Sequence, residues 1–164
     1  MRHFFLAILT CLLSTHCVCA QHLMTKTDGD QTIAYIDNCK FNAEKNDRGI
    51  KNLTYDITAL SSTDSVSVTT TIYSDKKFKP DSVVLMGAKK CAVEKVYIEP
   101  KGKKWVSRLR FYITMKEFES IAATSVAPEM AWYVGSDTVA FSIKPKDWEK
   151  QRATWQTAID ALDL

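Results

Sequence analysis

The sequence predicts an α+β fold: a mostly antiparallel β-sheet of about eight strands, either a sandwich or a curled sheet, with one short helix and a C-terminal amphipathic helix. Apolar side chains recur with a period of two from Thr32 onward, which is typical of half-buried strands. The period changes at Thr114, where a helix-start pattern appears. Short turns between the strand-like segments favour antiparallel neighbours.

The strand-like segments before the first helix share alternating apolar residues and are bounded by polar or turn-forming residues: 33–37, 53–57, 66–72, 83–86, 92–98 and 105–113. Pro100-Lys101-Gly102 predicts a hairpin between the last two, because proline presets φ and glycine accepts a positive φ. Alternation in the returning strand then assigns its residues to two faces. The core is expected to receive Trp105, Leu109, Phe111 and Ile113, and the outward face Arg108, Arg110 and Tyr112.

Two helices and one further hairpin complete the predicted order. Thr114 and Glu117 have capping-box spacing, so a short helix is expected from there to about Ala123. Alternating apolar residues over 130–134 and 139–143, separated by a glycine turn, predict two more strands. The last helix is expected from about Pro145 to Leu162. The inward residues of the two helices are Phe118, Ile121 and Ala122, and then Trp148, Trp155, Ile159 and Leu162.

The first twenty residues have the pattern of a secretory signal peptide. Arg2 and His3 precede an apolar run over 4–13, and Val18 and Ala20 supply small residues before a cleavage site. The run is too short to cross a bilayer, and the rest of the sequence has no second long apolar run, so no membrane span is expected. The predicted organisation is a signal peptide at 1–20, a flexible lead-in at 21–31 and a single domain at 32–164. Such a protein would be exported, periplasmic or secreted.

Two cysteines remain after the predicted cleavage site, Cys39 and Cys91. An oxidising compartment favours a disulfide between them, and the alternative is two buried thiols that never meet. Two cysteines and one histidine are too few for a structural zinc site, which usually takes four such ligands. No metal and no cofactor is predicted.

Basic residues concentrate in the middle of the chain. Residues 76–110 contain eleven Lys and Arg against three acidic residues, a local charge of +8, whereas 21–75 and 111–164 each carry −3. Neighbouring strands would place these residues on one face and one end of the sheet, where their potential attracts anions.

This basic block has a functional and a structural interpretation. In the functional one, the hairpin and the strand after it contact an anionic envelope glycolipid, a polysaccharide or an acidic protein partner; export makes nucleic acid an unsuitable target. In the structural one, the same lysines only keep a sheet face soluble and its edges unpaired. The candidate binding residues are Lys101, Lys103, Lys104, Arg108, Arg110 and Tyr112.

Catalytic signatures are lacking in the sequence. The only histidine after the predicted cleavage site, His22, falls in the predicted lead-in, and there is no nucleophile elbow, phosphate-binding glycine loop or zinc-protease pattern. The sequence therefore predicts a binding domain and no enzyme. Two alternatives stay open: an inhibitor or immunity protein of a partner enzyme, and a carbohydrate-active hydrolase. The hydrolase would need two carboxylates to converge from Glu94, Glu99, Glu117, Glu129 and Asp137.

Overall fold

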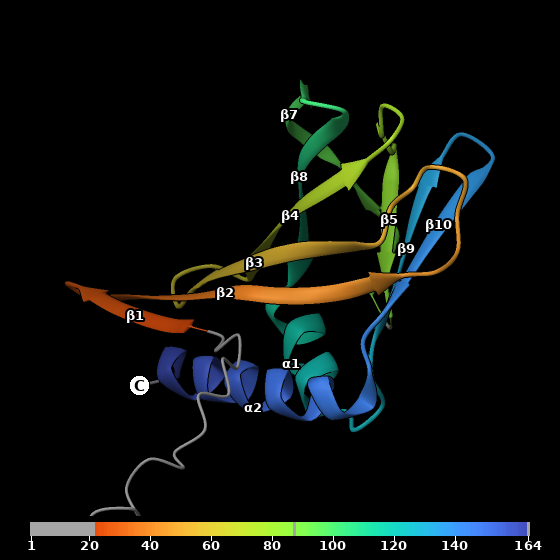
Figure 1. Cartoon of the computed structure of the whole chain (residues 1–164). Helices are drawn as coiled ribbons and strands as arrows, with labels where there is room; N and C mark the ends of the chain where they lie inside the picture. The colour runs from red at the N-terminus through yellow and green to blue at the C-terminus, as the bar shows by residue number, and fades with distance from the viewer. Residues whose placement is uncertain (1–21, 87, 164) are drawn as a thin grey trace, which may run out of the picture.

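A computed structural model describes residues 22–86 and 88–163, which form ten strands and two helices (Figure 1). The predicted signal peptide at 1–20 lies outside the described residues. The first strands in chain order are β1 (His22–Asp28), β2 (Gln31–Ala43), β3 (Asn52–Leu60), β4 (Ser65–Ser74) and β5 (Ser82–Leu85). The remaining elements are β6 (Cys91–Ala92), β7 (Glu94–Lys101), β8 (Lys104–Thr114), α1 (Met115–Ala123), β9 (Glu129–Val134), β10 (Asp137–Ser142) and α2 (Pro145–Leu162).

The strands form one antiparallel sheet in the order β6-β5-β9-β10-β2-β3-β4-β8-β7, with β1 added beside β2. Every pair in this order is antiparallel, as the short connections predict. The sheet curls until β6, at one end, contacts β8, next to the other end. The fold class is therefore confirmed in its curled form, as a nearly closed, barrel-like sheet with two helices.

The long strand β2 joins two parts of the sheet. Its first half pairs with β1, while Asn42 and Ala43 near its end pair with β10. Between these halves a bulge at Asp37 and Asn38 interrupts the register with β3, and Asn38 takes a left-handed φ of 57°. Because β2 offers a free edge before the bulge, His22–Asp28 forms a paired strand where the sequence predicted a flexible lead-in.

Both helices form where the sequence places them. Thr114 and Glu117 make the complete capping box of α1, and Pro145 occupies the first turn of α2. Helix α2 packs against β2 and α1 and lies across the lower side of the sheet in Figure 1. Neither helix of the described chain combines the length and the hydropathy of a membrane-crossing segment.

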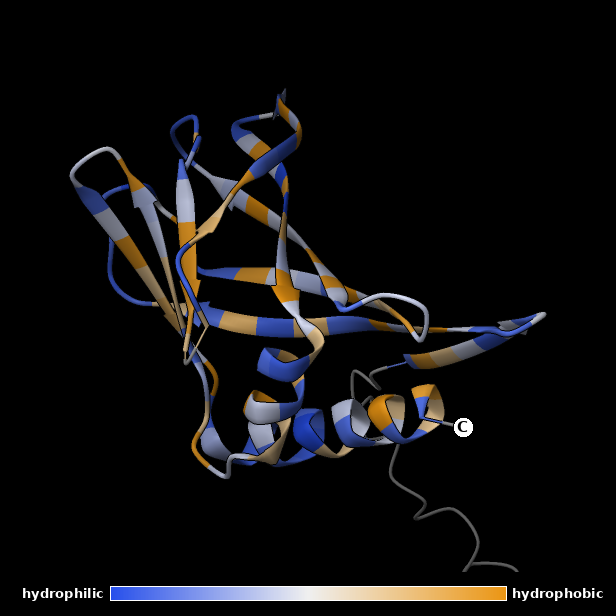
Figure 2. Ribbon diagram, turned by 180° about the vertical axis from the view of Figure 1, so that it is seen from behind, coloured by the Kyte–Doolittle hydropathy of each residue, from blue (hydrophilic) through white to orange (hydrophobic). Residues whose placement is uncertain are grey.

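The core fills the inside of the curled sheet and the space between the sheet and the helices. Apolar and polar residues alternate along the strands in Figure 2, and the inward set is buried. Trp132 packs edge-to-face against Phe111, with ring centroids 5.8 Å apart, inside the sheet. Nearer the helices, Trp155 contacts Trp148 at 5.3 Å between centroids, so the apolar stripe of α2 belongs to the core, as predicted.

The predicted disulfide between Cys39 and Cys91 is not formed: both are free thiols. Cys39 is buried on β2, opposite Tyr55 of β3, whereas Cys91 is half-buried on β6 at the end of the sheet. In the sheet, β5, β9 and β10 separate the two strands. Spacing along the sequence cannot reveal this separation, because strand order decides it.

Candidate functional site

The predicted hairpin forms between β7 and β8. Lys101 pairs with Lys104, and Gly102 takes φ of 61° in the two-residue turn between them. A side chain at this φ is strained, so glycine suits the position. The turn carries three lysines at the tip of one hairpin.

Alternation along β8 places the candidate residues outward. Leu109 and Phe111 are buried in the core, so Arg108, Arg110 and Tyr112 lie on the opposite side of the strand. We call the outward side of β4, β8 and β7 the hairpin face. Trp105 was predicted to be a core residue, but it is only half-buried at the end of the strand.

Cross-strand pairing adds residues that the sequence alone did not indicate. Tyr73 of β4 pairs with Val106, and Tyr97 of β7 pairs with Arg108. Val106 is 3% exposed and lies outside the main core cluster. Alternation along β4 could have indicated from the sequence that Tyr73 faces outward. Tyr97 could not be found in this way, because a bulge at residues 95–97 changes which face it occupies.

Two cations of the hairpin face are held by carboxylates of neighbouring elements. Arg108 donates to Asp56 of β3 and to the hydroxyl of Thr71, both at 3.0 Å. Lys104 forms an ion pair of 2.5 Å with Asp75. These contacts partly neutralise the two cations.

The other hairpin cations make fewer contacts with neighbouring side chains. Within the described residues, Lys101 and Lys103 form no ion pair, and Lys101 Nζ lies 5.9 Å from the ring centroid of Tyr73. Arg110 donates through Nε to Thr69 Oγ1 at 3.4 Å. Its remaining N–H groups make no described hydrogen bond, so Arg110, Lys101 and Lys103 are the cations best placed to receive an anion.

The basic block as a whole does not form one patch. Lys76 pairs with Asp47 at 3.1 Å, and Lys77 lies 5.6 Å from the ring of Trp105. Lys90 lies 4.5 Å from the ring of Tyr133 of β9, in a part of the sheet away from the hairpin. The expectation of a single shared face therefore fails, because Lys76 and Lys90 contact Asp47 and Tyr133, which lie outside the hairpin face.

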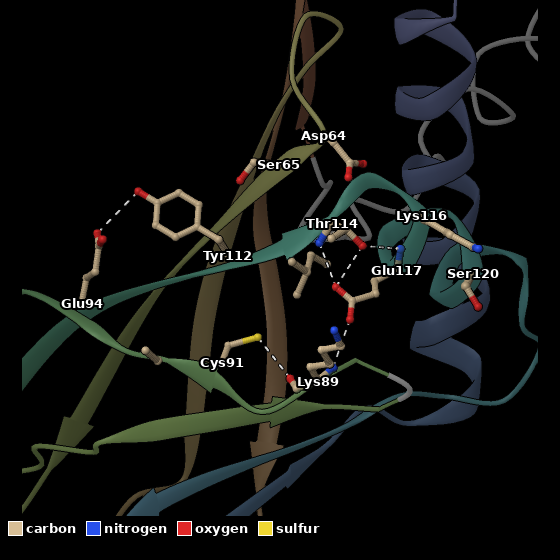
Figure 3. A pocket seen from close by; sticks show the side chains of 12 residues that line it. Asp64, Ser65, Lys89, Cys91, Glu94, Tyr112, Thr114, Lys116, Glu117 and Ser120 are labelled. Atoms are coloured by element: carbon tan, nitrogen blue, oxygen red, sulfur yellow. Dashed lines mark hydrogen bonds between the residues drawn. The ribbon is translucent and has the colours of Figure 1, made fainter.

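A cavity of about 810 Å³ lies where the curled sheet fails to close, between β6, β8 and the start of α1 (Figure 3). Tyr112 and Glu94 line it from the hairpin side, with the Tyr112 hydroxyl donating to Glu94 at 3.4 Å. The other lining residues come from the β3–β4 turn and the start of β4, from the end of β8, from β6 and the residues before it, and from α1; they include Asp64, Cys91, Lys116 and Glu117.

The carboxylate of Glu117 lines this cavity, but both of its oxygens already accept hydrogen bonds from the protein. The backbone N–H groups of Thr114, at 2.8 Å, and of Lys89, at 3.0 Å, donate to its two oxygens. These bonds hold the pKa of Glu117 below its ordinary value. A glycosidase acid needs the opposite shift, and of the five candidate carboxylates only Glu94 and Glu117 line the cavity.

Two other reactive groups of the described chain are Cys91, at the cavity, and His22, away from it. Burial raises the pKa of the Cys91 thiol, and the nearby Glu117 carboxylate adds to the effect, so its nucleophilic thiolate is disfavoured. His22 lies 3.5 Å from Asp37 at the start of β1, on another part of the sheet. Over residues 22–86 and 88–163, no three His, Cys, Asp or Glu side chains are grouped closely enough to hold a metal ion.

No family model matches the chain, and comparisons with curated proteins and with solved structures find no significant match.

Proposed function

We propose that this chain is an exported, soluble binding domain that contacts an anionic partner through the hairpin face. The observation that carries the proposal is the distribution of charge on this face. Arg108 and Lys104 are held by carboxylates, while Lys101, Lys103 and Arg110 retain donors for an external anion. The inhibitor and hydrolase alternatives remain predictions from the sequence.

Electrostatics supports the hairpin as the point of contact. Residues 94–112 carry six Lys and Arg against two Glu, a local charge of +4. A positive surface of this kind raises the rate of encounter with anions and orients them. An arginine that is held by its neighbours loses less side-chain entropy on binding than a mobile one.

The proposal predicts that Lys101→Gln/Lys103→Gln weakens binding to a polyanion by about tenfold or more, because charge-assisted contacts are lost. Dextran sulfate and poly-L-glutamate are suitable probes, measured by calorimetry at low and at high salt. Binding by the unchanged protein should weaken as salt rises, because salt screens the attraction.

Lys146→Gln/Lys150→Gln is the matched control. These lysines are exposed on α2, and the double change removes the same charge from the other side of the molecule. Equal affinities of the two double variants would contradict the proposal. So would an absence of polyanion binding by the unchanged protein.

A further inference from the structure

Three exposed tyrosines lie together on the hairpin face. Tyr73, Tyr97 and Tyr112 are 46%, 38% and 42% exposed and come from β4, β7 and β8. In register along β8 they lie at the levels of residues 106, 108 and 112, a span of about 20 Å. Exposed aromatic rings that share one face indicate a contact surface.

Cations lie along the same line as the tyrosines. Lys101 lies at the Tyr73 end, with its ammonium near that ring, and Arg110 lies one outward position from Tyr112 on β8. Arg108 lies beside Tyr97. Rings and positive charges therefore follow one another along β8 from the hairpin tip to the rim of the cavity, with two carboxylates of β7 among them: Glu99 pairs with Val106 and Glu94 with Arg110.

Hydroxyl groups cover the surface beside this line. Ser67 and Thr71 of β4 pair with Tyr112 and Arg108 and share their face. The Thr71 hydroxyl accepts a hydrogen bond from Arg108, so its own hydrogen is left to donate. The surface thus offers flat rings, hydroxyl groups and cations together.

Resting on the proposed function, we infer that the anionic partner is a polysaccharide bearing carboxylate or sulfate groups, bound along β8 from Lys101 to Tyr112. Its sugar rings lay their apolar C–H faces on the tyrosines, and its acidic groups meet Lys101, Lys103 and Arg110. An acidic polypeptide matches the charges but supplies no repeating ring faces. A lipid bilayer needs apolar side chains to insert, whereas this face is rich in hydroxyl groups.

The test compares Tyr97→Ala/Tyr112→Ala with the unchanged protein, using polygalacturonate, dextran sulfate, poly-L-glutamate, neutral dextran and anionic phospholipid vesicles as probes. Losing two rings should weaken binding of the two anionic polysaccharides by about tenfold and leave poly-L-glutamate binding nearly unchanged. Tyr133→Ala on β9 is the control, because this half-buried tyrosine lies in another part of the sheet. Thermal melts establish that each variant is folded.

The outcomes separate this inference from the proposed function. If the lysine variant loses binding while the tyrosine variant keeps it for every probe, the partner is recognised by charge alone and the polysaccharide inference is wrong. Stronger binding to vesicles or to poly-L-glutamate than to both anionic polysaccharides would overturn it too. Equal binding of neutral dextran and dextran sulfate, or no binding of any anionic probe, would overturn both.

Discussion

At the scale of single residues, the two thiols have distinct surroundings. Burial is the main reason that the pKa of Cys39 is raised to about 12. At neutral pH Cys39 is therefore held as the thiol. Cys91 is half-buried, and its pKa is raised as well. Neither thiol is activated for attack in the folded protein.

We therefore expect iodoacetamide at neutral pH to leave Cys39 unmodified in the folded protein and to modify Cys91 slowly. Unfolding in denaturant without a reductant should make both residues react fully. Peptide mass mapping before and after unfolding measures each cysteine separately. A peptide pair linked through Cys39 and Cys91 would contradict the free thiols of the structure.

At the scale of elements, Glu117 does more than cap a helix. It completes the capping box of α1 and also accepts the backbone N–H of Lys89, which lies just before β6. The carboxylate therefore ties α1 to the end of the sheet, beside the cavity. Its lowered pKa reports that these bonds favour the charged form.

The charge of Glu117 should stabilise the fold at neutral pH and not in acid. Its folded pKa lies below the ordinary value of 4.5, so the contribution is present above pH 4.5 and is lost as pH falls through the folded pKa. Urea unfolding should show Glu117→Gln to be less stable than the unchanged protein at neutral pH, with the difference closing in acid. Glu119→Gln is the control, since Glu119 accepts none of these hydrogen bonds. A difference independent of pH would show that the charge plays no part.

The edge strand β7 has features that prevent pairing with another chain. Its bulge at 95–97 bends the strand, Pro100 removes a backbone donor, and Lys95 and Lys101 place charge along the edge. These features keep the hairpin unpaired. Its outward face is then free for another kind of contact.

At the scale of the whole molecule, Trp155 joins the helices to the sheet. It is 1% exposed, and its ring centroid lies 4.9 Å from that of Phe118 on α1 and 6.2 Å from that of Tyr55 on β3. Its indole N–H has no hydrogen-bond partner in the structure, so its contribution comes from packing.

Trp155→Ala should lower the free energy of unfolding by about 3 to 5 kcal/mol, the usual cost of emptying a core aromatic site. Trp155→Phe should cost less, because it keeps a ring and removes the unpaired N–H. Urea denaturation measures both. Trp105→Ala, at a half-buried position, is a control with a smaller expected loss. An unchanged midpoint for Trp155→Ala would contradict the central place of this residue in the core.

Ion pairs connect the loops at the hairpin end of the sheet. Arg48 pairs with Asp137 at 3.0 Å, which joins the β2–β3 connection to the β9–β10 turn. The Lys76–Asp47 and Lys104–Asp75 pairs are exposed on both sides, and such pairs typically contribute only about 0 to 1 kcal/mol each. These two pairs lower the local positive charge, because Asp47 and Asp75 neutralise part of the basic block.

Features that depend on neighbouring residues could be predicted from the sequence. The capping box spans four residues, and the apolar stripe of α2 follows the helical period. Gly102 predicts the turn in which it lies. Alternation likewise put Arg108, Arg110 and Tyr112 outward on β8. Each of these signals is local, because backbone geometry repeats over a few residues.

Which segments meet became known from the folded chain. Strand order separates Cys39 from Cys91, and incomplete closure of the sheet leaves the cavity beside β6. Pairing added β1 to the sheet, and the bulge in β7 brought Tyr97 to the hairpin face. Alternation states which residues share a face of one strand. It does not predict which strand lies alongside, because strand pairing depends on packing between residues distant in the chain.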